Sequence, residues 1–242
     1  ERMLEDGAQE TGIYAASFRL LDAVNQFGFL FATPLFPLFA NMLRKRENTE
    51  QLLKFSAVLM FVFSVSVSVL CWVYSKPLMQ LQYTEANDYY AAIFGWLMLT
   101  FIPMSSIYIF GTLLTANGSL MLLNKIAIAG IVCNVGLNLF LIPPYGAFGT
   151  TIATLITQVL VAGIHILACN RKFQTNWEWN LLIRLGLFTG AAFGFVFLLS
   201  RVVDTIFVSL PLSAVVLLGL IFIFRLIPMD MILRFVRQPK SN

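Results

Sequence analysis

The chain has 242 residues, of which 59% are hydrophobic and only 12% are charged, and its formal net charge is +4. A soluble domain is typically about a quarter charged, so this composition excludes an ordinary soluble enzyme or binding domain and predicts a polytopic membrane protein. The basic residues lie mostly in short loops, where membrane topology is the usual reason for positive charge, so we expect no nucleic-acid partner.

Apolar runs predict an all-α integral membrane fold with about seven transmembrane helices, because roughly 20 apolar residues are needed to cross a ~30 Å hydrocarbon core. The expected helices span residues 11–43, 51–74, 89–116, 119–142, 148–169, 181–199 and 206–226. The segment 75–88 is expected to be a turn-like loop of mixed charge. The Pro-Pro-Tyr-Gly sequence at 143–146 leaves room only for a tight reversal, so the fourth and fifth helices should be antiparallel neighbours.

Loop charges predict the orientation of these helices, because Lys and Arg are retained on the cytoplasmic side of a membrane. On alternating assignment, one side collects most of the basic residues: Arg44, Lys45, Arg46, Lys54, Lys125, Arg171, Lys172, Arg184, Arg225, Arg234, Arg237 and Lys240. The other side collects only Arg2, Lys76 and Arg201. We therefore expect the chain to start outside and to end in a cytoplasmic basic tail at 227–242. Seven crossings with termini on opposite sides, and no signal-peptide pattern near Glu1, predict the latter part of a longer transporter.

The first predicted helix carries four polar residues within about two turns, namely Arg19, Asp22, Asn25 and Gln26. An ionisable residue inside a membrane is costly and usually faces a wet cavity or a partner. The guanidinium of Arg19 suits bidentate binding of phosphate or pyrophosphate, and the nearby carboxylate of Asp22 can orient or release it. Two structural alternatives stay open: Arg19 snorkels to water at the outer boundary, or it pairs with Asp22 inside the bundle.

Three prolines interrupt predicted helices. Pro34 and Pro37 fall in the first helix and Pro103 in the third. Each proline removes an intrahelical hydrogen bond and is expected to kink its helix. The kinks are hinge candidates for gating, with a static kink as the alternative.

Other polar and small residues occur at helical spacing, which is typical of helix packing. Asn134 and Asn138 lie one turn apart, and G-x-x-x-G is repeated from Gly186 to Gly194. His165 is the sole histidine and lies alone on an apolar span, which favours core packing over proton transfer. No metalloprotease, nucleophile-elbow, P-loop or dinucleotide motif occurs, so we expect no enzymatic activity, no cofactor and no metal site.

Two stretches resemble a known family. The sequence GIYAASFRL at 12–20, with PLF at 37–39, resembles the G-x-Y-s-x-A-x-[RK]-L segment that opens the second half of polysaccharide flippases. The sequence YGAFGTTIAT at 145–154 resembles the Y-G-a-x-G-A-A-x-A-T hairpin of the same family. The chain departs from that pattern at Thr150 and Thr151, where the family usually has alanine. The chain is thus similar to the C-terminal lobe of an oligosaccharide flippase of the multidrug/oligosaccharidyl-lipid/polysaccharide exporter superfamily.

The resemblance implies alternating access between two lobes, of which this chain supplies one and a missing N-terminal lobe the other. The implied substrate is a polyprenyl-pyrophosphate-linked oligosaccharide, moved across the bacterial inner membrane for O-antigen, lipopolysaccharide or other polysaccharide biosynthesis. Arg19 would attract the pyrophosphate with help from Asn25 and Gln26, and Asp22 would modulate it. Membrane lipid is an implied partner, and coupling to an ion gradient is left open.

Three alternatives to this reading stay open. A multidrug or cation exporter of the same superfamily would share the fold, but it would favour unpaired carboxylates, of which this stretch offers only Asp22. A flippase of a lipid-linked peptidoglycan precursor is a second relative. An integral-membrane glycan-processing enzyme is disfavoured because the predicted outer loops are short.

Overall fold

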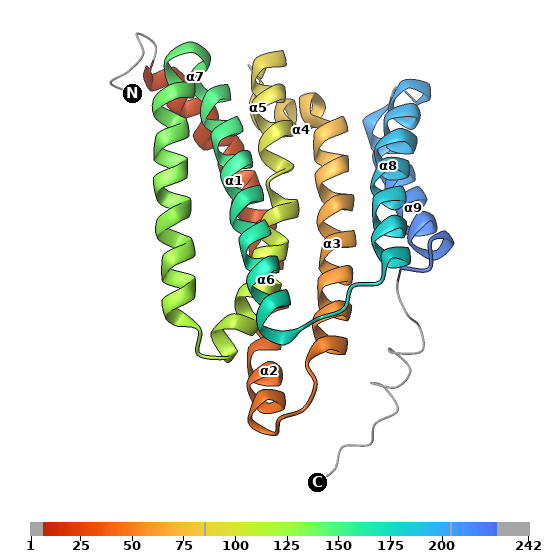
Figure 1. The fold of residues 1–242 in the computed structure, drawn as a ribbon. Coiled ribbons are helices and arrows are strands. Elements are labelled where there is room, and N and C mark those ends of the chain that lie inside the picture. Colours follow the sequence, from red (N-terminus) through yellow and green to blue (C-terminus); the bar gives the residue numbers. More distant parts are fainter. Residues whose placement is uncertain (1–6, 85, 204, 227–242) are drawn as a thin grey trace.

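The computed structural model describes residues 7–84, 86–203 and 205–226, and every regular element within them is an α-helix. The helices are α1 (Gly7–Ala32), α2 (Leu35–Arg44), α3 (Glu50–Val73), α4 (Ser75–Gln82), α5 (Asp88–Met98), α6 (Phe101–Ala116), α7 (Leu120–Phe173), α8 (Trp179–Val202) and α9 (Ile206–Ile223). Within these ranges, six helical stretches are long and apolar enough to cross a membrane. One of them, α7, runs the length of the bundle and returns, so that the predicted fourth and fifth helices are its two arms (Figure 1). The all-α membrane fold is confirmed.

The reversal of α7 lies at Gly146, which adopts a left-handed backbone with φ of 56°. Residues other than glycine rarely adopt this backbone conformation, so the predicted tight turn depends on Gly146. Three residues on, Gly149 lies against the backbone of the first arm, where an added Cβ would collide with the carbonyl of Leu141. The two glycines of the hairpin motif therefore make the turn and let the arms approach.

The proline positions coincide with breaks between helices. The first span divides at Thr33 and Pro34, and the third divides at Leu99 and Thr100. The threonine hydroxyls at both breaks donate to backbone carbonyls, Thr33 to Phe29 at 2.8 Å and Thr100 to Leu97 at 2.6 Å.

Two of the prolines then occupy the first turn of the helix that follows a break. Pro37 is the third residue of α2 and Pro103 is the third residue of α6. Proline is tolerated there because the first amides of a helix have no intrahelical partner. The predicted kinks are confirmed, whereas their hinge motion stays a prediction.

The prediction of a loop at 75–88 is wrong in part, because Ser75–Gln82 forms the short helix α4. Met79 in α4 is fully buried in the main core, and this contact stabilises a helix too short to persist alone. The remainder of the segment caps the next helix, since Asn87 Oδ1 accepts from the amides of Tyr89 and Tyr90 at 2.9 and 3.2 Å.

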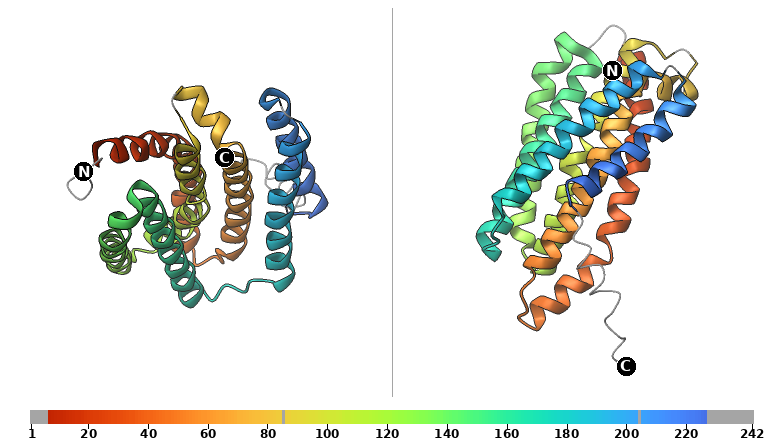
Figure 2. Two further views of the ribbon diagram at one scale, coloured as in Figure 1. Left: turned by 90° about the horizontal axis from the view of Figure 1, so that it is seen from above. Right: turned by 90° about the vertical axis from the view of Figure 1, so that its right-hand side faces the viewer.

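Buried side chains form two main cores. The larger draws on α1 to α6 and includes Cys169 of the second arm of α7. The smaller joins α3 to α8 and α9 through residues such as Val65, Phe188 and Leu217. Figures 1 and 2 show α7 on one flank of the bundle and α8 with α9 on the other, with α3 between them and the centre.

The bundle has one end rich in positive charge, which we call the basic end. There α2 and α9 end, α3 and α8 begin, and α7 both begins and ends (Figure 1). It carries the described members of the larger predicted set: Arg44, Lys45, Arg46, Lys54, Lys125, Arg171, Lys172, Arg184 and Arg225. The opposite end carries Lys76 and Arg201. Arg2 and the tail at 227–242 lie outside the described residues, and which end faces the cytoplasm stays a prediction.

Candidate substrate groove

A mainly apolar groove with several polar side chains in its walls lies between α1, α6 and both arms of α7. It consists of two adjoining cavities of about 450 and 400 Å³ that share Ala127, Gln158 and Val161. Its polar lining comes from all three helices: Tyr14, Tyr108, Asn124, Asn134, Thr154, Thr157, Gln158 and His165. Neutral hydroxyl, amide and imidazole groups on an apolar wall can bind a polar, uncharged ligand such as a sugar through hydrogen bonds.

Several lining groups also bond to one another. The Tyr14 hydroxyl lies 3.2 Å from Thr154 Oγ1 and joins α1 to the second arm of α7. Asn134 Nδ2 donates to Thr157 Oγ1 at 3.3 Å and joins the two arms. Asn134 thus joins two helix segments, as its spacing predicted, and these bonds lie along the wall of the groove.

His165 has the packing role that its apolar surroundings predicted. Its side chain is largely buried, and Nδ1 lies 2.8 Å from the carbonyl of Val161 one turn earlier. Gly111 of α6 packs against the imidazole, since an added Cβ there would lie 3.7 Å from the ring. One edge of the ring nevertheless lines the groove.

The four predicted site residues of α1 divide into two groups. Arg19, Asp22 and Gln26 are all exposed, because spacings of three and four residues keep them on one face of the helix. Asn25 is only 5% exposed and turns inward, where Nδ2 donates to Met104 Sδ at 3.6 Å. Its Oδ1 has no hydrogen-bond partner among the described residues. The structure thus brings three of the four together and separates Asn25 from them.

Of the alternatives left open for Arg19, pairing with Asp22 does not occur, since no ion pair joins them among the described residues. Asp22 is exposed on the same face of α1 as Arg19 and lines neither cavity of the groove. Arg19 lies nine residues beyond Glu10, or about 13 Å along the helix at 1.5 Å per residue. Since Glu10 contacts the α7 reversal at the end of the bundle, Arg19 lies about this far from that end, and whether it snorkels to water at the outer boundary stays open.

The hinge candidates do not line the groove themselves. Pro34 and Pro37 are exposed beside the break between α1 and α2, and Pro103 is buried. Met104, next to Pro103, contributes to the groove wall, so a change in the bend at Thr100 would move that wall.

Sequence reasoning missed the aromatic part of the groove. Tyr14 belongs to the 12–20 motif and Tyr108 to α6, but neither was a predicted site residue. The ring of Tyr108 packs on Gly28 of α1, where an added Cβ would lie 3.1 Å from it. The pairing of a glycine in α1 with a tyrosine in α6 indicates a contact only when the two helices are known to be neighbours, so the sequence alone could not reveal it.

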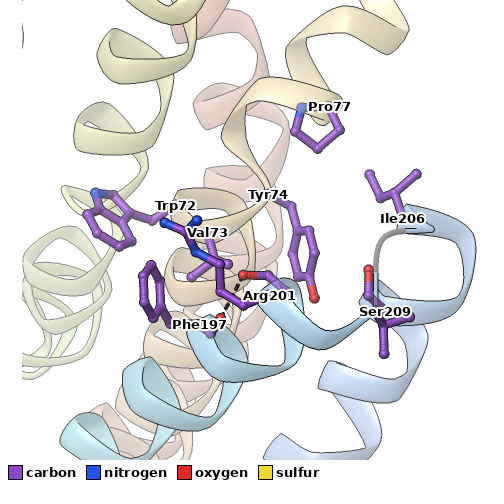
Figure 3. A pocket seen from close by; sticks show the side chains of 10 residues that line it. Trp72, Val73, Tyr74, Pro77, Phe197, Arg201, Ile206 and Ser209 are labelled. Atoms are coloured by element: carbon purple, nitrogen blue, oxygen red, sulfur yellow. Dashed lines mark hydrogen bonds between the residues drawn. The ribbon is translucent and has the colours of Figure 1, made fainter.

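A separate cavity of about 530 Å³ lies at the end of the bundle opposite the basic end, between α3, α4, α8 and α9 (Figure 3). Trp72, Tyr74 and Phe197 line it, and the Arg201 guanidinium carbon lies 5.1 Å from the centre of the Phe197 ring. Aromatic and basic side chains gather in this way at membrane–water interfaces.

No three His, Cys, Asp or Glu side chains come together as metal ligands in the part of the chain that the structure describes. The groove therefore offers hydrogen-bonding groups, whereas Arg19 and Asp22 are exposed elsewhere on α1 and do not line it.

Comparison with known families bears on this arrangement. Residues 4–236 match the model of a family described as lipid II flippase MurJ. The chain belongs to this family. No curated protein and no solved structure gives a significant match.

Membership of the MurJ family confirms the expected general kind of protein. The chain is a multi-pass membrane protein of a flippase family within the superfamily that the two motifs indicated, and its family acts on a lipid-linked precursor. The family's description names the peptidoglycan-precursor relative that the sequence motifs left open beside polysaccharide flippases.

Proposed function

We propose that this chain forms one lobe of a flippase that moves a polyprenyl-pyrophosphate-linked saccharide from the cytoplasmic to the outer face of a bacterial inner membrane. The groove between α1, α6 and α7, which several hydrogen-bonding side chains line, is the observation that carries the proposal; Arg19 and Asp22 are exposed on α1, the helix that supplies one of its walls. The family match along almost the whole chain supports it. The other wall of the cavity would come from an N-terminal lobe of the same protein.

The chemistry of the groove fits the two polar parts of such a substrate. Pyrophosphate needs a cation with several donors, and the exposed guanidinium of Arg19 offers a bidentate fork. Sugars need neutral donors and acceptors, which Gln158, Asn124 and Tyr108 offer. The carboxylate of Asp22, three residues from Arg19, would compete for the guanidinium and help release the substrate.

The breaks at Thr33–Pro34 and Leu99–Thr100 are where we propose that helices bend during alternating access. Hinges are a few residues at the ends of elements, and rigid bundles then rock around a fixed site. Pro34, Pro37 and Pro103 would keep these points free of regular hydrogen bonding. In this proposal an ion gradient drives the cycle. The protein is a transporter and has no enzymatic activity, cofactor or nucleic-acid partner.

The family's description favours lipid II, a peptidoglycan precursor, over the longer O-antigen or other polysaccharide precursors. Both carry the same polyprenyl pyrophosphate, so Arg19 would serve either. They differ in the saccharide that meets the groove.

A complementation experiment tests both the function and the role of Arg19. The full-length gene is depleted and replaced by wild type, Arg19→Ala, Arg19→Lys or the control Arg171→Ala, which removes an exposed arginine at the basic end. Lipid-linked precursors are then measured on each membrane face. We expect depletion and Arg19→Ala to trap lipid II on the cytoplasmic face, Arg19→Lys to restore part of the transport, and Arg171→Ala to restore all of it.

Other outcomes are equally informative. If an oligosaccharide precursor accumulates while the distribution of lipid II stays normal, the protein would still be a flippase, but its substrate would be the oligosaccharide precursor. Normal distribution of every lipid-linked precursor, with sensitivity to cationic drugs, would replace the proposal by a multidrug exporter, for which Asp22 would be the natural cation ligand.

A further inference from the structure

We propose that a pocket at the basic end, between α3, α8 and α9, binds the phosphate head group of an anionic phospholipid. The pocket has a volume of about 310 Å³ and lies apart from the substrate groove. Its walls carry Lys54 of α3, Arg184 of α8 and Arg225 just after α9. We call it the basic pocket, and the inference needs only that the chain spans a membrane.

Among the described residues, the positive charges of the basic pocket exceed the negative ones. Lys54 bonds Glu50 one turn earlier at 2.8 Å, and Glu178 also lines the pocket. Arg184 and Arg225 are exposed, and neither forms an ion pair with a described residue. Two guanidinium groups thus face a pocket with a net positive charge, and such groups bind phosphate oxygens strongly.

The backbone holds Arg225 beside the pocket that Arg184 also lines. Arg225 adopts a left-handed conformation with φ of 47°, closed by a bond from its amide to the carbonyl of Phe222 at 3.0 Å. The next residue, Leu226, is 2% exposed and anchors the chain in the core shared by α3, α8 and α9. The left-handed turn therefore fixes Arg225 at the mouth of the pocket.

The start of α8 adds to the attraction for an anion. Glu178, Asn180 and Leu181 line the pocket around the first turn of this 24-residue helix, and the Glu178 side chain does not cap it. The positive end of the helix dipole therefore lies at the pocket, where it favours a negative group.

The surroundings indicate a lipid as the source of that phosphate. The pocket lies where membrane-spanning helices α8 and α9 begin and end, which is the depth of lipid head groups (Figure 1). Val58 and Leu181 form its apolar side, which would meet the glycerol and the first methylenes of an acyl chain. Basic pockets between membrane helices bind anionic head groups in this way.

The bias of positive charge toward one membrane side explains basic residues in loops, but it does not require three of them to line one pocket. Lys54 lies in α3, Arg184 in α8 and Arg225 just after α9, so three separate segments bring their basic residues to one pocket. The cavity at the opposite end of the same helices has a single described basic residue, Arg201 (Figure 3). The two cavities therefore differ in a way that loop charge alone does not predict.

The test compares lipid binding by purified full-length protein in detergent. Native mass spectrometry follows titration with dioctanoyl-phosphatidylglycerol or dioctanoyl-phosphatidylcholine. The variants are R184Q/R225Q, the charge-keeping R184K/R225K, and the control R44Q/R171Q, which removes two exposed arginines from the same end but outside the pocket. Thermal unfolding of each variant checks that the fold is kept.

We expect wild type to bind phosphatidylglycerol about tenfold more tightly than phosphatidylcholine, because each charge-assisted bond to phosphate contributes strongly. R184Q/R225Q should lose this preference, whereas R184K/R225K and R44Q/R171Q should keep most of it. Equal loss in R184Q/R225Q and R44Q/R171Q, or no loss in R184Q/R225Q, would overturn the site. If R184Q/R225Q unfolds, the result for R184K/R225K tests the site instead. A folded R184K/R225K protein that has lost all preference for phosphatidylglycerol would overturn a site based on charge.

A further arm separates the lipid from soluble phosphate. Inorganic phosphate is added as a competitor during the phosphatidylglycerol titration. We expect it to compete only at far higher concentration, because it cannot use the apolar side formed by Val58 and Leu181. If inorganic phosphate competes at a concentration equal to that of the lipid, the pocket binds soluble phosphate and the proposal of a lipid ligand is overturned.

Discussion

At the scale of single residues, α7 contains glycines with opposite physical roles. Gly149 lies so close to the carbonyl of Leu141 that an added Cβ would collide with backbone, which cannot move aside as a side chain can. Gly136, in the first arm of the same helix, has no atom within 4 Å of an added Cβ. The same chemical change should therefore have opposite effects at the two positions.

We expect Gly149→Ala to lower the free energy of unfolding by about 3 kcal/mol, because the arms must separate to admit the methyl group. Gly136→Ala should raise it by roughly 0.5–1 kcal/mol, since alanine loses less backbone entropy in a helix interior. Thermal unfolding of the purified protein in detergent measures both. Equal effects of the two substitutions would contradict the close approach of the arms at Gly149.

The sequence predicted some residues well and others poorly. The turn at Gly146 follows from Pro-Pro-Tyr-Gly alone, because few conformations suit that tetrapeptide. Helical spacing correctly grouped Arg19, Asp22 and Gln26 on one face, but Asn25 lies about 100° from Gln26 around the helix and faces α6. That inward direction depends on where α6 packs, which spacing on α1 does not contain.

At the scale of elements, one carboxylate joins three helices at the end of the bundle opposite the basic end. Glu10 of α1 accepts hydrogen bonds from the amide of Ala147 at 2.6 Å and from the Tyr89 hydroxyl of α5 at 2.7 Å. Ala147 follows the reversal of α7, so Glu10 caps the second arm there. These two hydrogen bonds therefore hold the α7 hairpin to α1 and α5.

We expect Glu10→Ala to destabilise the protein by about 1–3 kcal/mol and Tyr89→Phe by about 1 kcal/mol, because each leaves a partner without its hydrogen bond. The double variant should cost less than the sum, because both changes remove the same bond. Thermal unfolding measures this double-mutant cycle, with Gln9→Ala as the control on an exposed neighbour. Strict additivity of the two changes would mean that the bond contributes nothing.

The elements that were predicted from sequence are those with long apolar runs. The breaks near Pro34 and Pro103 were also predicted, because proline acts through its own ring. The helix α4 was not, since Lys76 and Pro77 interrupt its eight residues and its stability comes from burying Met79. The G-x-x-x-G repeat predicted close packing that α8 does not make, since no described atom lies within 4 Å of an added Cβ at Gly186 or Gly194.

At the scale of the whole molecule, the helical bundle has two packing units that share α3. The pair α8 and α9 packs on α3 through its own core, and the buried bond between the Tyr74 and Ser213 hydroxyls at 2.9 Å joins α3 to α9. The groove instead lies between α1, α6 and α7, on the other side of the bundle (Figure 2). Loosening of α8 and α9 should therefore leave the groove intact.

Phe188→Ala tests this separation, because Phe188 is fully buried between α8 and α3. The cavity should destabilise the α8–α9 unit by about 3–5 kcal/mol. Hydrogen exchange measured by mass spectrometry in detergent should then show faster exchange in α8 and α9, with α6 and α7 unchanged. The control is Phe195→Ala on the same helix, where the side chain is 51% exposed and little change is expected. Faster exchange in α7 as well would mean that the lobe opens as one cooperative body, and that the groove depends on α8 and α9 for its shape.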